Sequence, residues 1–108
     1  MTMTAAEAIE TAFGILKLLS LRDVDALAHQ LTDKRLMALA LAEIDAYPCT
    51  IIEPSRSVID RASAVLTMEG EMSIEIPFFS MEEGVSDLEL RLWLRDGPIV
   101  TRIDVLVP

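Results

Sequence analysis

The sequence predicts an α+β fold in which three N-terminal helices pack on one face of a curved antiparallel sheet of about four strands. Apolar residues recur with helical spacing as far as Ala46, and they alternate with polar residues from Met72 onward. Helices that precede all the strands are typical of this class. The 108 residues are expected to form one domain, residues 1–108, with a helical half (4–46) and a sheet half (58–107).

The first predicted helix begins with a capping signal. Thr4 and Glu7 have the spacing of a capping box, in which each side chain bonds a backbone N–H near the other. The helix is therefore expected over residues 5–19. Its main apolar stripe is predicted to face the core and consists of Ile9, Phe13 and Leu16.

Two shorter helices are expected to follow. Asp23 is a good N-cap for residues 24–31, and Thr32 is expected to cap a third helix over residues 33–46. Pro48 ends it, because the residue before a proline is pushed out of helical geometry. The residues predicted to face the core from these helices are Leu27, Leu31, Leu36, Met37, Leu39, Ala40 and Ile44.

The segment 58–68 fits both a helical stripe and a strand, and we favour a strand over residues 61–68. Glu69 and Gly70 then form a hairpin turn into a clear alternating run. Pro77 lies in that run and has no N–H to donate, so we expect it at a sheet edge or a strand end. The inward residues of the run are predicted to be Met72, Ile74, Ile76 and Phe78.

The last quarter of the chain predicts a long hairpin. Its first arm alternates inward leucines with mostly charged residues, and its second arm is expected to place Ile99, Ile103, Val105 and Val107 inward. A four-residue loop, Asp96–Ile99, avoids pairing like charges. That register sets Arg91 opposite Asp104 and Trp93 opposite Arg102, where a cation–π contact is expected. The inward leucines are Leu88, Leu90, Leu92 and Leu94.

Composition and charge exclude several classes of function. The formal net charge is −9, and no Lys or Arg occurs among the seven acids between Glu69 and Glu89. Nucleic acids and anionic membrane surfaces need basic contacts, so neither is expected as a partner, whereas a basic protein fits. Hydrophobic residues make up 52% of the chain, which favours a homodimer or an internal pocket.

The titratable residues predict no catalytic or metal site. His29 is expected to face solvent, although Asp25 lies one helical turn away and could orient it. Cys49, the only cysteine, follows a helix C-terminus and is expected to be an inert thiol. No disulfide can form within the chain, no signal peptide is recognised at its start, and no cofactor is expected; the cytoplasm is the expected location.

An acidic rim and an outward-facing cluster are the candidate binding sites. The acidic rim consists of Glu82, Glu83 and Asp87, which are expected to form a solvated acidic turn; binding of a hard cation is the alternative. The outward cluster is predicted on the sheet face away from the helices, where Asp104 is expected to pair with Arg91. Tryptophan and arginine are common interface anchors, so the cluster is a candidate dimer or partner interface. Its residues are Trp93, Arg91, Arg102, Asp104 and Val100.

Part of the chain resembles known families. The order of three helices and a strand meander is similar to the NTF2-like (cystatin-type α+β) architecture. More narrowly, residues 82–90 and 103–107 resemble a small uncharacterised bacterial domain family, in which an acidic Gly-Ser-Asp turn launches the penultimate strand. This narrower resemblance covers residues 78–107. The NTF2-like resemblance implies a pocket between sheet and helices, and dimers through the outer sheet face, but no particular activity.

The function expected from these features is that of a small acidic binding protein that forms a homodimer through its outer sheet face. An immunity-type inhibitor of a basic toxin is the specific form, because the chain is small, acidic and without a catalytic constellation. The alternative is a small-molecule-binding protein or enzyme with a pocket between helices and sheet. Whether the chain is an enzyme is left open, with a non-enzymatic role favoured.

Overall fold

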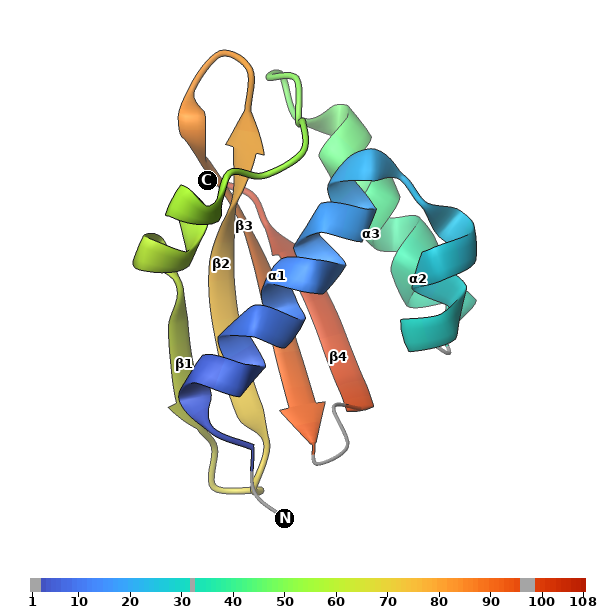
Figure 1. Ribbon diagram of the computed structural model, residues 1–108. Helices are drawn as coiled ribbons and strands as arrows, with labels where there is room; N and C mark the ends of the chain where they lie inside the picture. Colours follow the sequence, from blue (N-terminus) through green and yellow to red (C-terminus); the bar gives the residue numbers. More distant parts are fainter. Residues whose placement is uncertain (1–2, 32, 96–98) are drawn as a thin grey trace.

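A computed structural model describes residues 3–31, 33–95 and 99–108. The predicted α+β class is confirmed: the helices pack on one face of a four-stranded antiparallel sheet (Figure 1). The sheet is a meander with strand order β1-β2-β3-β4. The elements are α1 (Ala5–Leu21), α2 (Val24–Gln30), α3 (Lys34–Ala46), the 3₁₀ helix η1 (Arg56–Arg61), β1 (Ser63–Leu66), β2 (Met72–Ser80), β3 (Gly84–Arg95) and β4 (Ile99–Leu106).

The capping box of α1 is confirmed. The hydroxyl of Thr4 accepts from the N–H of Glu7, and the Glu7 carboxylate accepts from the N–H of Thr4, both at 3.1 Å. The helix continues two residues past its predicted end and stops at Arg22, whose φ of 55° is left-handed. From this position Arg22 forms a salt bridge of 2.8 Å with Asp45 at the end of α3, which ties the two helices together.

Aspartates cap both short helices. Asp23 accepts from the N–H of Ala26 at 3.1 Å, as expected. The predicted cap of α3 was wrong, because Asp33 accepts from the N–H groups of Arg35 and Leu36 at 2.9 and 3.3 Å and so occupies the N-cap position. Thr32 itself lies outside the described residues.

The segment 58–68, which fits both a helix and a strand by its sequence, is helical in its N-terminal part and extended in its C-terminal part. Ser55 caps η1, which occupies residues 56–61, and β1 is only the four residues Ser63–Leu66. The strand predicted over residues 61–68 is therefore too long at both ends. Ser55 provides the reason at the N-terminal end, since its hydroxyl accepts from the N–H of Ser57 and supports a helical turn.

Pro77 has the edge position that was predicted for it. It lies within β2 opposite Glu89 of β3. On the other side, β1 pairs with β2 only as far as Glu75, so β2 has a single neighbouring strand at Pro77. The pairing of β2 and β3 also shifts between Pro77 and Phe79. The missing N–H is thus placed where the ladder is already interrupted.

The register of the last hairpin is confirmed in its central part and wrong near the turn. Arg91 lies opposite Asp104 and Trp93 opposite Arg102, as predicted. A β-bulge then leaves Thr101 without an opposite residue in β3, so Leu94 pairs with Val100 and Arg95 with Ile99. Ile99 is therefore in the strand and not in the loop; the remaining residues of the expected loop, 96–98, lie outside the described residues.

The bulge also reverses two side-chain directions. A shift of one residue moves a strand's side chains to the opposite face of the sheet. Val100 joins Leu94 on the helix-covered face and packs against the core, whereas Ile99, predicted inward, is 52% exposed. Val107, also predicted inward, is 59% exposed because it lies past the end of β4. Val100 therefore does not belong to the outer face, and this part of the predicted interface was wrong.

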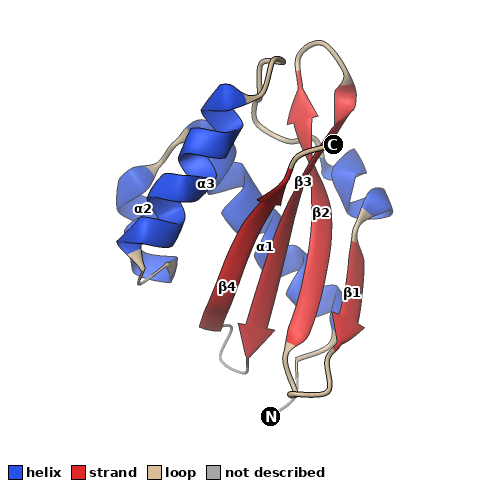
Figure 2. Ribbon diagram, turned by 180° about the vertical axis from the view of Figure 1, so that it is seen from behind, coloured by secondary structure: helices blue, strands red, loops and turns tan. Residues whose placement is uncertain are grey.

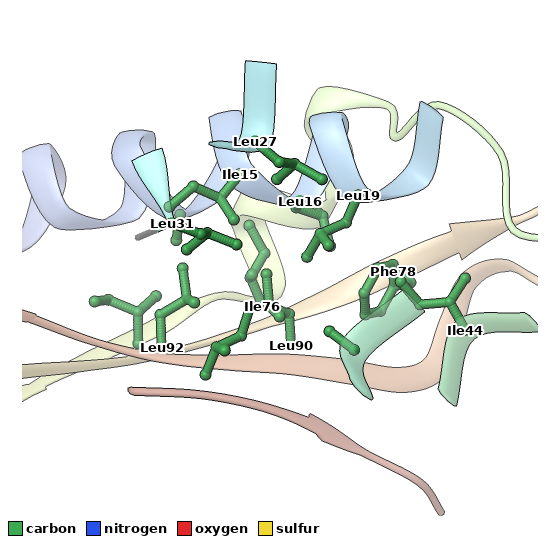
Figure 3. Close-up of a cluster of buried hydrophobic side chains, with 14 of the residues drawn as sticks. Ile15, Leu16, Leu19, Leu27, Leu31, Ile44, Ile76, Phe78, Leu90 and Leu92 are labelled. Carbon is green, nitrogen blue, oxygen red and sulfur yellow. The ribbon is translucent and has the colours of Figure 1, made fainter. Parts of the chain in front are cut away.

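The space between helices and sheet is filled by aliphatic side chains and Phe78 (Figure 3). All four inward leucines of β3 are at most 1% exposed, as predicted. Of the stripe predicted for α1, Leu16 is fully buried, whereas Ile9 and Phe13 are only partly buried. Alanines allow this helix to lie close to β2, while Phe13 lies on its flank under the Arg56 guanidinium. The buried residues of α1 are Ala8, Ala12, Ile15, Leu16, Leu19 and Ser20.

The predicted inward position of Leu39 was also wrong. The helix α3 packs mainly on β4 at the edge of the sheet, so only a narrow side of it contacts the core. Met37, Ala40 and Ile44 fill that side. Leu39 is 56% exposed.

Candidate functional site

The face of the sheet opposite the helices is the candidate site. Seen from behind, the strands lie in front of α1, and none of the drawn helices lies in front of the strands (Figure 2). We call this surface the outer face. Cross-strand pairing aligns its side chains in two rows, namely Val65, Ser73, Trp93 and Arg102, and beside them Ser63, Glu75, Arg91 and Asp104.

Trp93 is the centre of the outer face. Its ring is half-buried and two guanidinium groups lie over it, with the Arg102 carbon 4.5 Å and the Arg91 carbon 5.6 Å from the ring centroid. The predicted cation–π contact with Arg102 is therefore confirmed. Each guanidinium over the indole adds a cation–π attraction that favours the observed orientation of the ring.

The ion pairs on this face differ from those expected. Arg91 forms a salt bridge with Glu75 of β2, and its Nε lies 3.0 Å from the Glu75 carboxylate. Asp104 pairs instead with Arg102 of its own strand at 3.3 Å. The predicted pairing of Asp104 with Arg91 was wrong although the two residues lie opposite each other, because Glu75 competes for the same guanidinium from the other neighbouring strand.

Burial distinguishes the two ion pairs. The side chains of Arg91 and Glu75 are each 35% exposed, whereas Arg102 is 64% exposed. The first pair is held within the sheet, and Arg102 is the more accessible cation beside Trp93. The sequence analysis did not include Glu75 in this cluster. Its alternation with the inward residues of β2 places it on the outer face and could have predicted the contact.

The acidic rim has a structural role, because its glutamates connect two loops by hydrogen bonds. Glu82 lies after β2, and its carboxylate accepts from both the N–H and the hydroxyl of Thr50 at 2.7 and 2.9 Å. Glu83 accepts from the hydroxyls of Tyr47, Ser80 and Ser86 at 3.0, 3.1 and 2.8 Å. The two carboxylates therefore join the β2–β3 turn to the loop after α3.

These hydrogen bonds set the charge state of the rim. The hydrogen bond from Ser86 lowers the pKa of Glu83, and the backbone hydrogen bond from Thr50 lowers the pKa of Glu82. Both carboxylates are thus held ionised at neutral pH. Asp87, the third residue of the rim, is exposed.

The carboxylates of Glu82 and Glu83 in the rim are engaged by hydrogen-bond donors of the chain itself. Within residues 3–31, 33–95 and 99–108, no group of three or more His, Cys, Asp or Glu side chains is placed to hold a metal ion. The oxygens of Glu82 and Glu83 already accept hydrogen bonds from Thr50 and from three hydroxyls. Sequence reasoning missed Tyr47 and Thr50, because their contacts with the rim span more than thirty positions of the chain.

His29 and Cys49 occupy separate places. His29 is exposed on α2, as predicted. Cys49 lies beside the acidic rim, where burial, and next the charge of Glu83, raise the pKa of its thiol. A raised pKa disfavours the nucleophilic thiolate, so this cysteine has the opposite of the environment that activates thiols.

Comparison with known proteins identifies the family. Residues 16–106 match the family described as "Domain of unknown function (DUF7668)". The chain belongs to this family. The DUF7668 match covers the C-terminal part of α1, from Leu16 onward, together with α2, α3 and the whole sheet, so both halves of the fold are included. No curated protein and no solved structure matches the chain. The NTF2-like resemblance therefore stays a prediction.

Among the residues that the structure describes, no helix is long and apolar enough to cross a membrane.

Proposed function

We propose that this chain is a non-enzymatic binding protein whose outer face takes a basic protein partner. The observation that carries the proposal is Trp93, which is half-buried on the uncovered sheet face and has the guanidinium groups of Arg91 and Arg102 over its ring. A large aromatic side chain with a fixed orientation contributes much contact area at little conformational cost. Arg102 beside it supplies exposed hydrogen-bond donors.

The charge of the chain favours a basic partner over a second copy. The formal net charge is −9, and two copies would repel each other, whereas a cationic protein would be attracted over a long range. The outer face is also rich in charged side chains, as non-obligate interfaces are, while permanent homodimer interfaces are more apolar. The homodimer predicted from the sequence is the competing occupant of this face.

An immunity-type inhibitor of a basic toxin is one protein of this kind. From the sequence alone, the acidic stretch from Glu69 to Glu89, which includes the acidic rim, is the expected surface for such a contact. Glu82 and Glu83 accept hydrogen bonds within the chain and are not free to bind a partner directly. We therefore place the main contact for the partner at Trp93, while the acids contribute a long-range electrostatic attraction.

The test compares three immobilised proteins for capture from a lysate of the source organism. The wild type is set against Trp93→Asp, and Asp60→Lys on the distant η1 helix serves as a charge-changing control with Trp93 intact. The expected result is one basic protein that wild type and control retain and Trp93→Asp loses. Circular dichroism verifies that each variant is folded.

Light scattering separates the two occupants. A monomer at micromolar concentration agrees with the proposal, and a dimer that Trp93→Asp dissociates would assign the outer face to a second copy instead. If the wild type and Trp93→Asp capture the same proteins from the lysate, the proposal is also refuted.

A further inference from the structure

We propose that the open edge of β4 and the side of α3 form a second binding site, which takes an extended peptide with alternating apolar and basic residues. The site lies at the opposite edge of the sheet from η1 and does not depend on the outer face (Figure 1). We call it the edge groove. Its lining residues come from the C-terminal end of α2, from α3 and from the β3–β4 hairpin.

Two adjacent hollows make up the edge groove. The first, of about 230 Å³, lies between α3 and the central part of β4, and the second, of about 330 Å³, lies toward the hairpin end. They share Leu36 as a common wall. Together they follow β4 from Ile99 to Val105, so the groove has the length and direction of an extended chain.

The backbone of β4 provides the first recognition element. Within the described part of the chain, β4 pairs with β3 alone, and its other side is the edge of the sheet. An edge strand carries unpaired N–H and C=O groups that an added strand can bind. Residues Ile99–Leu106 include no proline or lysine, which natural edge strands often use to prevent such pairing.

Apolar side chains provide the second element. In a strand added to β4, every second side chain would enter the space beneath α3. There Leu39, which is 56% exposed, and the partly buried Leu36 face Ile103 of the sheet across the first hollow. Because α3 lies at the sheet edge, Leu39 remains exposed and is available to an apolar side chain of the added strand.

Charge selects the occupant. Glu43 of α3 lines the first hollow, and at the other end Asp33 and Arg95 line the second. Asp104 also borders the first hollow, but its carboxylate pairs with Arg102 on the outer face and is not counted here. The acids outnumber the one cation, and the chain as a whole carries a charge of −9. A peptide with lysine or arginine between its apolar residues therefore complements the groove, and an acidic peptide does not.

A second copy of the chain is a poorer occupant. Both α2 and α3 extend past β4 at this edge in the two opposite views (Figure 2). In an antiparallel edge-to-edge pair, the helices of both copies would lie on the same side of the joined sheet and compete for that space. A single extended segment needs only the groove itself.

The test uses a defined probe, the acetylated and amidated heptapeptide Lys-Val-Lys-Val-Lys-Val-Lys, titrated into the ¹⁵N-labelled full chain. The expected result is saturable binding with amide shifts concentrated in residues 99–105 and 36–43. The same peptide with N-methylated valines is expected to bind at least about tenfold more weakly, because it cannot extend the sheet. The matched peptide with glutamate for lysine is expected not to bind.

Charge variants localise the site. Glu43→Lys is expected to weaken binding of the heptapeptide about fivefold, and Asp60→Lys, which changes net charge equally at the far edge of the sheet, less than about twofold. Trp93→Ser is expected to leave the affinity unchanged, which separates this site from the outer face. Absence of binding at millimolar peptide, equal effects of the two lysine variants, or shifts confined to the outer face would overturn the proposal.

Discussion

Trp93 and Arg102 face each other across β3 and β4, with the guanidinium carbon 4.5 Å from the centroid of the ring. The same guanidinium lies 3.3 Å from Asp104, so one cation links an aromatic ring and a carboxylate on the uncovered face. Trp93 is the only tryptophan of the chain. Its fluorescence therefore reports on this contact without labelling.

Removal of the Arg102 guanidinium is expected to cost little stability and to change the indole environment. We expect Arg102→Gln to lower the free energy of unfolding by about 0.5–1 kcal/mol, the range for an exposed cation–π contact. The tryptophan emission of the folded protein is expected to shift. Urea unfolding followed by fluorescence measures both. Unchanged emission together with unchanged stability would show that the contact is not populated.

Truncation of the core is expected to have a much larger effect. Leu92 is fully buried in the centre of β3, and Leu39 is exposed on α3. Leu92→Ala is expected to destabilise the fold by about 2–5 kcal/mol, because it leaves a cavity that the packed helices cannot fill. Leu39→Ala is expected to change stability by less than about 0.5 kcal/mol. Similar losses for the two variants in urea unfolding would contradict the described packing.

The acidic rim predicts a specific dependence of stability on pH. The pKa of Glu83 is lowered from its ordinary value of 4.5 chiefly by the hydrogen bond from Ser86. A group whose pKa is lower in the folded state adds stability above its unfolded pKa, and this contribution is lost as the pH falls through the folded pKa. Glu83→Gln is therefore expected to destabilise the protein at pH 7 and to approach the wild type below pH 4.5.

A matched variant controls this experiment. Asp60→Asn removes an exposed carboxylate on η1 and is expected to leave the pH dependence of unfolding close to that of the wild type. Urea unfolding of the three proteins at several pH values between 3 and 7 provides the comparison. A difference between Glu83→Gln and the wild type that stays constant over this range would exclude the charged form of Glu83 as the cause.

Cys49 is expected to react slowly. Burial, followed by the charge of Glu83, raises the pKa of its thiol above the ordinary value of 9.0, so little thiolate is present at neutral pH. Alkylation by iodoacetamide at pH 8 is expected to be slower in the folded protein than in urea. Folded Glu83→Gln is expected to react faster than the folded wild type. Faster alkylation of the wild type in its folded state would contradict this environment.

Periodicity predicted the layers of the fold and the centre of its last hairpin. The helix caps at Thr4 and Asp23 and the pairing of Trp93 with Arg102 follow from local rules, and they are confirmed. The bulge at Thr101 cannot be predicted from the alternation of apolar and polar residues. Alternation continues on each side of the extra residue, and only the faces to which the side chains point are exchanged. This is why Val100 was assigned to the wrong face.

The contacts of the candidate sites were the least predictable part. Glu83 accepts from Tyr47, which precedes it by 36 positions, and such a contact depends on how two loops meet in space. The choice of Arg91 between Glu75 and Asp104 depends on side-chain geometry that register alone does not determine. The exposure of Leu39 arises because α3 lies at the sheet edge, whereas its sequence pattern suits a more central helix.

The most direct test of the central claim is isothermal titration calorimetry of the captured basic protein against the wild type, Trp93→Asp and Asp60→Lys. An anchor at the centre of an interface contributes more than about 2 kcal/mol, so we predict that Trp93→Asp weakens the affinity at least about thirtyfold. Asp60→Lys is predicted to change it less than about threefold. Equal affinities of the wild type and folded Trp93→Asp would contradict the account.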